Sequence, residues 1–289
     1  MNRRTPNGFS GGVGGKIDER FSPLIYLPDY KEYGMVRVIE TKDLMKIYNY
    51  GTPGETAALN KVTFHADEGD FVTVMGPSGS GKSTFINVLS TLDFYTGGTV
   101  TLMGKDVRQM NSNEVARFRR EHLGFVFQEF NLLDTETIYE NIGLSAAILK
   151  TDRRKITDRL QELAERFRIA DILNKYPYEC SAGQRQRAAI CRALIHDPDI
   201  IMADEPTGAL DSSNSFELMK IMKQLNDEQG VTIIMVTHDP LVASFSKRMI
   251  MIRDGSIEHE VVRGDMTQKE YLREINALQD AENEGLLSI

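Results

Sequence analysis

The residues best suited to chemistry form one glycine-rich run, Gly76-Pro77-Ser78-Gly79-Ser80-Gly81-Lys82-Ser83. The run matches the pattern G-x-x-x-x-G-K-[ST] at every fixed position, after the apolar stretch Phe71–Met75 and ahead of a helix-like stretch, Phe85 to Leu92. Glycines let successive backbone N–H groups turn around phosphate oxygens, and the start of the following helix adds partial positive charge. The pattern predicts a nucleotide phosphate site in which Lys82 reaches the β- and γ-phosphates and the Ser83 hydroxyl binds Mg²⁺.

Two adjacent carboxylates end a second apolar stretch. Asp204 and Glu205 follow Ile200–Ala203, which has the composition of a buried strand. In open α/β sheets, ligands bind in the crevice at the carboxyl ends of the strands. Asp204 therefore suits Mg²⁺, through a water molecule, and Glu205 suits a general base that polarises an attacking water. Alone, two acids that merely solvate a strand end before Pro206 would be an equal alternative; the glycine-rich run favours the chemical interpretation.

Other polar residues stand in comparable places. Gln128 follows the apolar stretch Leu123–Phe127 and His238 follows Val231–Val236, so both are expected at the same sheet edge, although a histidine after a strand is more often an ordinary surface residue. The segment Cys180-Ser181-Ala182-Gly183-Gln184 precedes a helical pattern, Arg185 to Ile195. A serine and free backbone N–H groups at a helix start predict either a second anion site or a simple N-cap.

The elements that must position these residues are strands alternating with helices. Stretches that are apolar on both faces predict strands of a covered sheet at Leu123–Phe127, Ile200–Ala203 and Val231–Val236. Val62–Phe64 and Phe71–Met75 flank a turn at Glu68-Gly69 and are expected to be antiparallel. Two further turns are expected, at Gly97-Gly98 before Val100–Met103 and, as a hairpin, at Asp254-Gly255 after Met249–Ile252.

Helices are predicted where apolar residues recur every three or four positions. One stripe runs from Ile156 to Phe167, a second covers Leu218, Ile221, Met222 and Leu225 and ends at Gly230, and a third covers Leu272, Ile275 and Leu278 within Gln268 to Ala281. All three fit helix faces packed in a core. The sequence thus predicts an α/β fold with a mostly parallel sheet and some antiparallel strands.

Composition limits the class of protein. With 41% hydrophobic and 26% charged residues in 289, the chain is typical of globular proteins rather than disordered or fibrous ones. Its net charge of −8 argues against nucleic acid as the main ligand. No stretch approaches the roughly 18 apolar residues of a membrane span, and polar residues follow Arg3 and Arg4 where a signal peptide would be apolar. With two cysteines, which suit reduced thiols, we expect a soluble cytoplasmic protein.

Taken in order, these motifs resemble the nucleotide-binding domains of ABC transporters. The resemblance runs from about Val36 to Val262 and includes the glycine-rich run, Gln128, the Ser-x-Gly-Gln segment, the Asp-Glu pair, Gly208-Ala209-Leu210-Asp211 and His238. Within that family, Gly76–Thr84, Gly124–Gln128 with Phe130–Leu133, and Asp204–Asp211 look like the macrolide-exporter and lipoprotein-release group. Phe130–Asp134, followed by Glu140-Asn141, is similar to the bacitracin-type antimicrobial-peptide transporters.

The resemblance implies a fold and a division of the chain. The fold is the P-loop NTPase core of ABC type, with a mostly parallel sheet, antiparallel strands and a helical signature subdomain. Residues 1–35 would be a flexible N-terminal extension, 36–262 the ATP-binding domain with the helical subdomain at about 129–185, and 263–289 a C-terminal helix and tail.

The resemblance also implies ATP and Mg²⁺ as cofactors and gives each site residue a role. Phosphate binding falls to Gly76, Pro77, Ser78, Gly79, Ser80, Gly81, Lys82, Ser83 and Thr84, and adenine stacking to Tyr48, with Tyr50 as the fallback and packing alone as an alternative. Glu205 would polarise the attacking water, and His238 would contact the γ-phosphate. Asp204 and Ser83 would bind the metal, and Gln128 would sense both the metal and the membrane partner. Ser181, Ala182, Gly183, Gln184 and Asp211 would face ATP held by a second copy.

A dimer of two chains around two ATP should act on a separate membrane permease, with this subunit on the inner face of the membrane. The docking surface is expected within Glu129 to Leu149, together with the helix Ile156–Phe167. The residue pattern of both segments predicts helices. Cargo would be of peptide, antibiotic or lipid type, exported or extracted. An ATPase that drives a membrane signalling or cell-wall partner stays open, whereas one acting on ribosomes or DNA is disfavoured by the single domain and the negative charge. The family's usual Leu-Ser-Gly-Gly-Gln departs here at Cys180 and Ala182, and Ala182 adds a Cβ where the backbone approaches phosphate.

Overall fold

The computed structural model describes residues 36–148 and 153–287, which form two sheets and eight α-helices; the expectation for residues 1–35 lies outside this range. The four-stranded antiparallel sheet has the order β2-β1-β4-β5 and consists of β1 (Arg37–Tyr48), β2 (Thr56–Asp67), β4 (Gly97–Leu102) and β5 (Lys105–Asp106). The six-stranded sheet has the order β10-β9-β3-β8-β7-β6 and consists of β3 (Phe71–Met75), β6 (Leu123–Val126), β7 (Ile200–Asp204), β8 (Thr232–Val236), β9 (Arg248–Arg253) and β10 (Ser256–Val262).

All neighbours in the six-stranded sheet are parallel except β9 and β10, which form an antiparallel hairpin across Asp254-Gly255. Both the mostly parallel sheet and this hairpin were expected from the sequence, and both are confirmed. The α/β fold class is confirmed with them.

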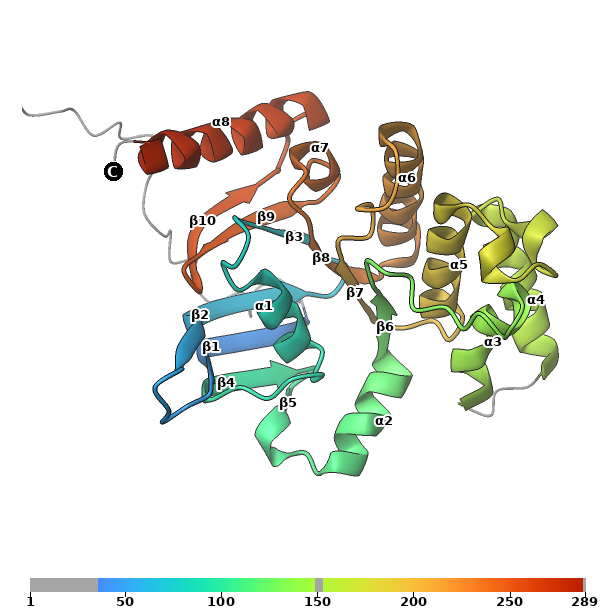
Figure 1. Cartoon of the computed structure of the whole chain (residues 1–289), viewed down its shortest axis with the longest axis horizontal. Coiled ribbons are helices and arrows are strands. Elements are labelled where there is room, and N and C mark those ends of the chain that lie inside the picture. Colours follow the sequence, from blue (N-terminus) through green and yellow to red (C-terminus); the bar gives the residue numbers. More distant parts are fainter. Residues whose placement is uncertain (1–35, 149–152, 288–289) are drawn as a thin grey trace, which may run out of the picture.

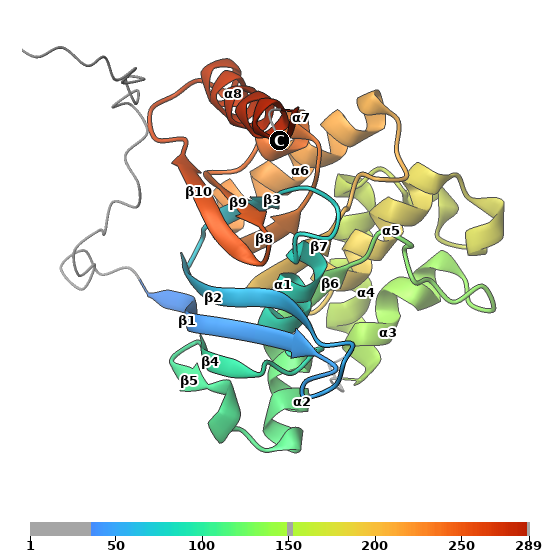
Figure 2. The same cartoon turned by 60° about the vertical axis from the view of Figure 1, so that its left-hand side comes forward.

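The helices gather in distinct places around the sheets (Figure 1). They are α1 (Lys82–Leu89), α2 (Ser112–His122), α3 (Ile138–Ile148), α4 (Arg153–Arg166), α5 (Ala182–Leu194), α6 (Ser212–Gln229), α7 (Pro240–Ala243) and α8 (Gln268–Leu287). Helices α3, α4 and α5 contact one another on the side of the molecule away from the four-stranded sheet. Helix α1 contacts β2 of one sheet and β7 and β8 of the other, and so lies between the two sheets (Figure 2).

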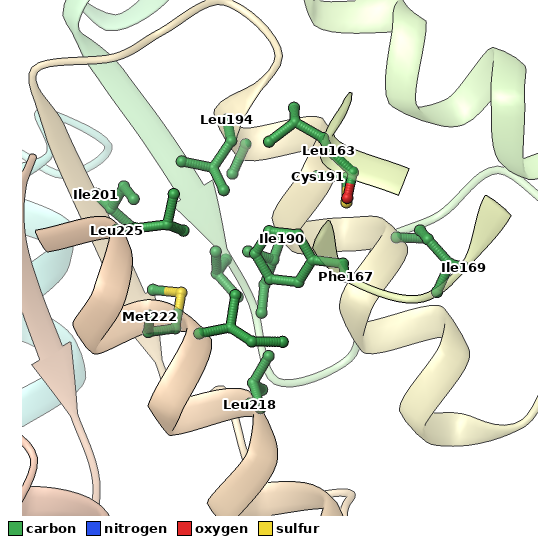
Figure 3. Close-up of a cluster of buried hydrophobic side chains, with 14 of the residues drawn as sticks. Leu163, Phe167, Ile169, Ile190, Cys191, Leu194, Ile201, Leu218, Met222 and Leu225 are labelled. Atoms are coloured by element: carbon green, nitrogen blue, oxygen red, sulfur yellow. The ribbon is translucent and has the colours of Figure 1, made fainter. Parts of the chain in front are cut away.

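The six-stranded sheet is covered on both faces because its strands are apolar at successive positions. Along β7, Ile200 and Met202 join the core that contains α1 and the four-stranded sheet, while Ile201 and Ala203 join the core under the helices. This alternation follows from the two-residue period of a strand. Figure 3 shows the second core, in which Ile201 meets side chains of α4, α5 and α6, among them Leu163, Ile190 and Leu225. Helix α8 closes a third, smaller core through Tyr271, Ile275 and Leu278.

Two strand expectations are wrong. Strands β2 and β3 follow each other in the chain but do not pair, because β2 bonds with β1 in one sheet whereas β3 lies between β8 and β9 in the other. Gly97 and Gly98 begin β4 rather than preceding it, and Gly97 pairs with Met45 of β1. At Gly98 a Cβ would collide with the backbone of Lys42 and Asp43, so the close approach of β1 accounts for glycine inside this strand.

Several helix boundaries also differ from expectation. Helix α1 begins at Lys82, inside the glycine-rich run, and ends at Leu89; α4 and α5 each begin about three residues early, and α8 continues to Leu287. Residues 129–137 were expected to be helical with the rest of Glu129 to Leu149, but α3 begins only at Ile138. Phe130 and Asn131 have φ values of 60° and 49°, which a right-handed helix cannot contain. The end of α6 at Gly230, with φ 69°, is confirmed.

Candidate nucleotide site

The carboxyl ends of four parallel strands lie level with one another. Val74 of β3 and Asp204 of β7 both pair with Val236 of β8, and Ala203 pairs with Val126 of β6. The glycine-rich run, Gln128, the Asp-Glu pair and His238 all follow these strand ends. The structure therefore brings together, at the carboxyl end of the sheet, the groups that the sequence analysis expected there. Figure 1 shows the strands β3, β8, β7 and β6 that end at this place.

Conformation and packing both require glycine in the phosphate loop. Gly76, Gly79 and Gly81 have φ values of 145°, 79° and 106°, in the region that side-chain-bearing residues rarely occupy. A Cβ on Gly76 would collide with the carbonyl oxygen of Ile252, and one on Gly81 with that of Ala58. The approach of phosphate was the reason expected for these glycines; the structure adds that two of them pack directly against the strands β9 and β2.

Lys82 and Ser83 open the first turn of α1. The Lys82 Nζ donates hydrogen bonds to the carbonyls of Gly76 and Pro77, at 2.9 and 2.7 Å, and so holds the loop closed. Burial lowers the pKa of Lys82, while the charges of Glu205 and Asp204 act in the opposite direction. All three charged groups therefore share one small region.

Asp204 meets the side chain of Ser83 across the gap between β7 and α1. Burial raises the pKa of Asp204, against the lowering effect of its hydrogen bond with Ser83. A partly buried carboxylate beside a hydroxyl is a pair of hard oxygen donors, which is what Mg²⁺ prefers. Within residues 36–148 and 153–287 no three His, Cys, Asp or Glu side chains form a metal cluster of their own, so Mg²⁺ would need Ser83 and phosphate oxygens as well.

The side chains of Glu205 and His238 are within hydrogen-bond distance, with 2.8 Å between Glu205 Oε1 and His238 Nδ1. The Glu205 backbone has a φ of 47°, and its N–H donates to the carbonyl of Val236 at 3.0 Å. The Glu205 side chain is only 16% exposed, whereas that of His238 is 73% exposed. The carboxylate is thus held in place under the histidine, which does not fit an acid that merely solvates a strand end.

Gln128 lies in the turn after β6 and reaches the segment that follows Glu205. A Cβ placed on Gly208 would lie 3.3 Å from Gln128 Nε2 and 3.4 Å from the carbonyl oxygen of Glu205. The amide of Gln128 therefore packs against Gly208, near the backbone carbonyl of Glu205. The Gln128 side chain also carries an amide oxygen, which is a hard donor of the kind that Ser83 and Asp204 offer.

Tyr48 ends β1 next to the phosphate loop. Its hydroxyl donates to Asp93 Oδ2 at 2.8 Å and lies 3.4 Å from the Thr84 hydroxyl, while Lys46 Nζ sits 4.5 Å from the ring centroid. Burial acts to raise the pKa of Asp93, but hydrogen bonds from Lys46 and Tyr48 lower it overall. Asp93 was not predicted as a site residue, because its side-chain partners, Lys46 and Tyr48, lie more than 40 residues away in the sequence. The fallback residue Tyr50 is 70% exposed.

The segment Ser181–Gln184 lies elsewhere, at the start of α5. Ser181 is the N-cap: its hydroxyl accepts from the N–H of Gln184 at 3.3 Å, and the Gln184 side chain accepts from the N–H of Ser181 at 2.9 Å. The N-cap interpretation is therefore correct, and an anion site could share the same helix start. A Cβ on Gly183 would lie 3.7 Å from Leu210 and 3.8 Å from Asn214, so α5 starts beside α6, whose N-cap is Asp211.

Comparison with known proteins settles the family. Residues 59–208 match the family model described as "ABC transporter". The chain belongs to the ABC transporter family. It is 42% identical over 243 residues to the bacitracin export ATP-binding protein BceA of Halalkalibacterium halodurans, covering 84% of this chain and 95% of that protein. It is also 42% identical over 223 residues to the macrolide export ATP-binding/permease protein MacB of Escherichia coli (strain K12), covering 77% of this chain and 34% of MacB.

Solved structures agree with the fold and the activity of this ABC ATPase. A dimeric structure of the bacterial ABC transporter cassette MJ0796 is 40% identical, with a TM-score of 0.72, and the match covers 78% of this chain and 98% of that one. A second dimeric structure of MJ0796, in a post-hydrolysis state, holds ADP and Pi, at 39% identity and a TM-score of 0.72. The chain is an ATP-binding and ATP-hydrolysing subunit with the ABC cassette fold. Within residues 36–148 and 153–287, no helix has both the length and the apolar character of a membrane span.

Proposed function

We propose that this ABC ATPase pairs with a second copy of itself around two ATP molecules and powers a separate permease in the membrane. The relatives support the proposal, because BceA is a bacitracin export protein, MacB a macrolide export protein, and MJ0796 a dimer. We infer cargo of the same chemical range, namely peptide, antibiotic or lipid-type molecules that are exported or extracted. The subunit would then work on the inner face of the cytoplasmic membrane, attached through the permease.

One observation carries the dimer. The groups suited to phosphate fall into two places, the sheet edge around Lys82 and the paired helix starts at Ser181 and Asp211. In a face-to-face pair of chains, the helix starts of one copy would meet the ATP held at the sheet edge of the other. Each nucleotide would then be enclosed by both chains.

Each site residue has an assigned role within this proposal. The phosphate loop, from Gly76 to Thr84, holds the phosphates, and the exposed Tyr48 ring stacks on adenine. The second copy's ATP is contacted by Ser181, Ala182, Gly183, Gln184 and Asp211. Ser83, Asp204 and Gln128 would hold Mg²⁺, which when bound would neutralise phosphate charge.

In this proposal, Glu205 and His238, which contact each other, carry out the hydrolysis step together. Glu205 accepts a proton from water while the water oxygen bonds to the γ-phosphorus and the bond to the bridging oxygen of ADP breaks. Because His238 turns its Nδ1 toward Glu205, its Nε2 is the ring nitrogen left to face the γ-phosphate. The same contact orients the carboxylate, so a single pair serves the water and the phosphate.

We also propose the division of the chain given by its family resemblance. Residues 36–262 would be the ATP-binding domain, with a helical subdomain at about 129–185, and residues 1–35 and 263–289 would lie outside it. The contact between α3 and α4 supports the subdomain, and both helices also contact α5, which begins where the subdomain would end. Its docking surface for the permease would include α3 and α4.

The experiment traps the dimer and asks what it binds. Glu205→Gln should form an ATP-dependent dimer, measured by light scattering after gel filtration with ATP and Mg²⁺, and should return to monomer with ADP. Purified from native membranes with ATP, it should bring a polytopic membrane protein. A permanent monomer would contradict the shared site, and ribosomal proteins or DNA in place of a membrane protein would contradict the transporter function. The matched control, Glu274→Gln on the exposed side of α8, should behave as wild type.

A further inference from the structure

The turn that carries Gln128 has an unusual backbone. Phe130 and Asn131 are consecutive non-glycine residues with φ values of 60° and 49°. Two internal hydrogen bonds shape the turn, from the Phe130 N–H to the carbonyl of Phe127 at 3.3 Å and from the Asn131 N–H to that of Glu129 at 2.6 Å. Left-handed conformations are unfavourable for residues that carry a side chain, so contacts from outside the turn are needed to hold it.

Arg192 of α5 provides that support. One of its terminal nitrogens donates to the carbonyl of Asn131, and the other donates to the carbonyl of Phe130 at 2.7 Å. A guanidinium fork can bond two successive carbonyls at once, which the single ammonium of lysine cannot reproduce. Arg192 therefore fixes the two strained residues together.

Arg185, on the same helix, connects the same turn to the signature segment. Its guanidinium lies 5.2 Å from the centroid of the Phe130 ring, and its Nη1 donates to the carbonyl of Cys180 at 2.7 Å. Cys180 directly precedes Ser181, the N-cap of α5. Residues seven apart lie two turns along one face of a helix, so Arg185 and Arg192 reach the turn from the same side.

We infer that Arg185 and Arg192 are positioning residues that join the Gln128 turn to the Ser181 helix start, so that one moves with the other. Neither side chain is among the groups assigned to ATP. The inference rests on the proposed function, in which Gln128 serves one nucleotide and Ser181 serves the nucleotide of the second copy. Through α5, the geometry of each ATP site becomes dependent on the other.

Arginine-to-methionine variants test whether Arg185 and Arg192 connect the Gln128 turn to the start of α5. The same helix supplies a matched control. Arg187 also lies on α5 but donates to the carbonyl of Phe167, away from the turn. In Arg192→Met and Arg185→Met, kcat should fall by about tenfold to a hundredfold, the loss typical of misplacing a catalytic group by about 1 Å. The monomer's affinity for a fluorescent ATP analogue should stay unchanged, and the Mg²⁺ concentration for half-maximal activity should rise.

Two further measurements separate positioning from simple stability. Hydrogen exchange should accelerate at the amides of residues 129–132 in Arg192→Met and stay at the wild-type rate there in Arg187→Met. The double variant Arg185→Met/Arg192→Met should be no slower than the worse single variant, because both act on one turn. Arg192→Lys should recover only part of kcat.

Opposite results overturn the inference. It fails if Arg187→Met loses as much kcat as Arg192→Met at an equal fall in Tm, or if Arg192→Met keeps wild-type kcat. A wild-type protein that neither hydrolyses ATP nor dimerises would instead contradict the proposed function. The two failures are therefore distinguishable from the same set of proteins.

Discussion

The sheet edge and the start of α5 use their polar groups in different ways. At the sheet edge, side chains from separate elements bond one another: His238 with Glu205, and Ser83 of α1 with Asp204 of β7. At the start of α5 the bonds are local, since Ser181 and Gln184 cap their own helix and, nearby, Asp211 bonds Asn214 three residues on. The sheet-edge contacts are complete within a single chain. At the start of α5, in contrast, the chain forms only the helix cap, and Ser181 is exposed.

This difference shows what each kind of variant can report. A change at the sheet edge disturbs contacts that already exist in the monomer. A change at the start of α5 alters the helix cap and, under the proposed function, a contact made only between two chains. Variants that preserve the cap can therefore isolate the contact between chains.

The largest effect is expected at the sheet edge, from Glu205→Gln. The amide keeps the size of the carboxylate but no longer accepts the proton of water, so kcat should fall roughly 10²–10⁴-fold. ATP affinity should persist because Lys82 and the loop are untouched. Phosphate release under saturating ATP and Mg²⁺ measures the loss. Wild-type turnover in this variant would mean that Glu205 is not the base.

At the start of α5, Ser181→Asp and Ser181→Asn form a matched pair. Both residues cap helices about as well as serine, so Tm should stay near that of wild type. The aspartate would place negative charge against the partner's phosphates. The penalty of several kcal/mol should lower dimer affinity by about a hundredfold or more, and kcat should fall with it.

Gel filtration of each Ser181 variant in the Glu205→Gln background separates dimer from monomer, and nucleotide titration of the monomer is the control. The aspartate variant should bind ATP and stay monomeric, while the asparagine variant should retain most dimerisation. Loss of ATP binding by the aspartate monomer would place Ser181 at its own chain's nucleotide and break the distinction between the two regions.

The sheet-edge half of the arrangement was accessible from sequence because its signals are local. Residues such as Asp204 and Gly76 directly follow apolar stretches, so the sequence itself indicates that they lie at the carboxyl ends of the strands. Parallel strands bring these ends together. Local signals of this kind also predicted the covered sheet, the hairpin at Asp254-Gly255 and the end of a helix at Gly230.

What the sequence did not give depends on contacts between distant residues. Strand β2 pairs with β1, which precedes it, and not with β3 across the nearby turn at Glu68-Gly69. Asp93 gains its importance only from Tyr48 and Lys46, and the turn at Phe130 only from an arginine 62 residues later. No periodicity marks such pairs, so they follow from the fold rather than predict it.

Tyr48 sharpens the comparison at the rim of the sheet edge. In Tyr48→Leu the ring is lost, and stacking on a base contributes about 1–3 kcal/mol, so KM for ATP should rise roughly tenfold with kcat retained. Tyr48→Phe keeps the ring but loses the bond to Asp93, and should change KM much less. Tyr50→Leu is the control for the second tyrosine. An equal rise in KM in Tyr48→Leu and Tyr48→Phe would show that the hydroxyl matters and that the ring packs without stacking on adenine.

The smallest expected effect concerns the free energy of unfolding at the sheet edge. Because burial raises the pKa of Asp204, the folded state binds more protons there than the unfolded state over the pH range between the ordinary and the raised pKa. Across that range the contribution of Asp204 to stability falls as pH rises, and above the raised pKa its ionised form disfavours folding. Asp204→Asn removes the charge, so the nucleotide-free variant should melt a few degrees at most above wild type at neutral pH.

The Tm difference between Asp204→Asn and wild type should shrink as the pH is lowered toward the ordinary pKa of aspartate, about 3.9. Calorimetry across this pH series measures it, with the exposed Asp265→Asn as the control that should track wild type. A variant less stable than wild type at neutral pH would mean that the ionised form of Asp204 already holds the sheet edge together through Lys82 and Ser83. In that case the edge would owe its order to internal ion pairing, and binding of Mg²⁺ there would have to compete with it.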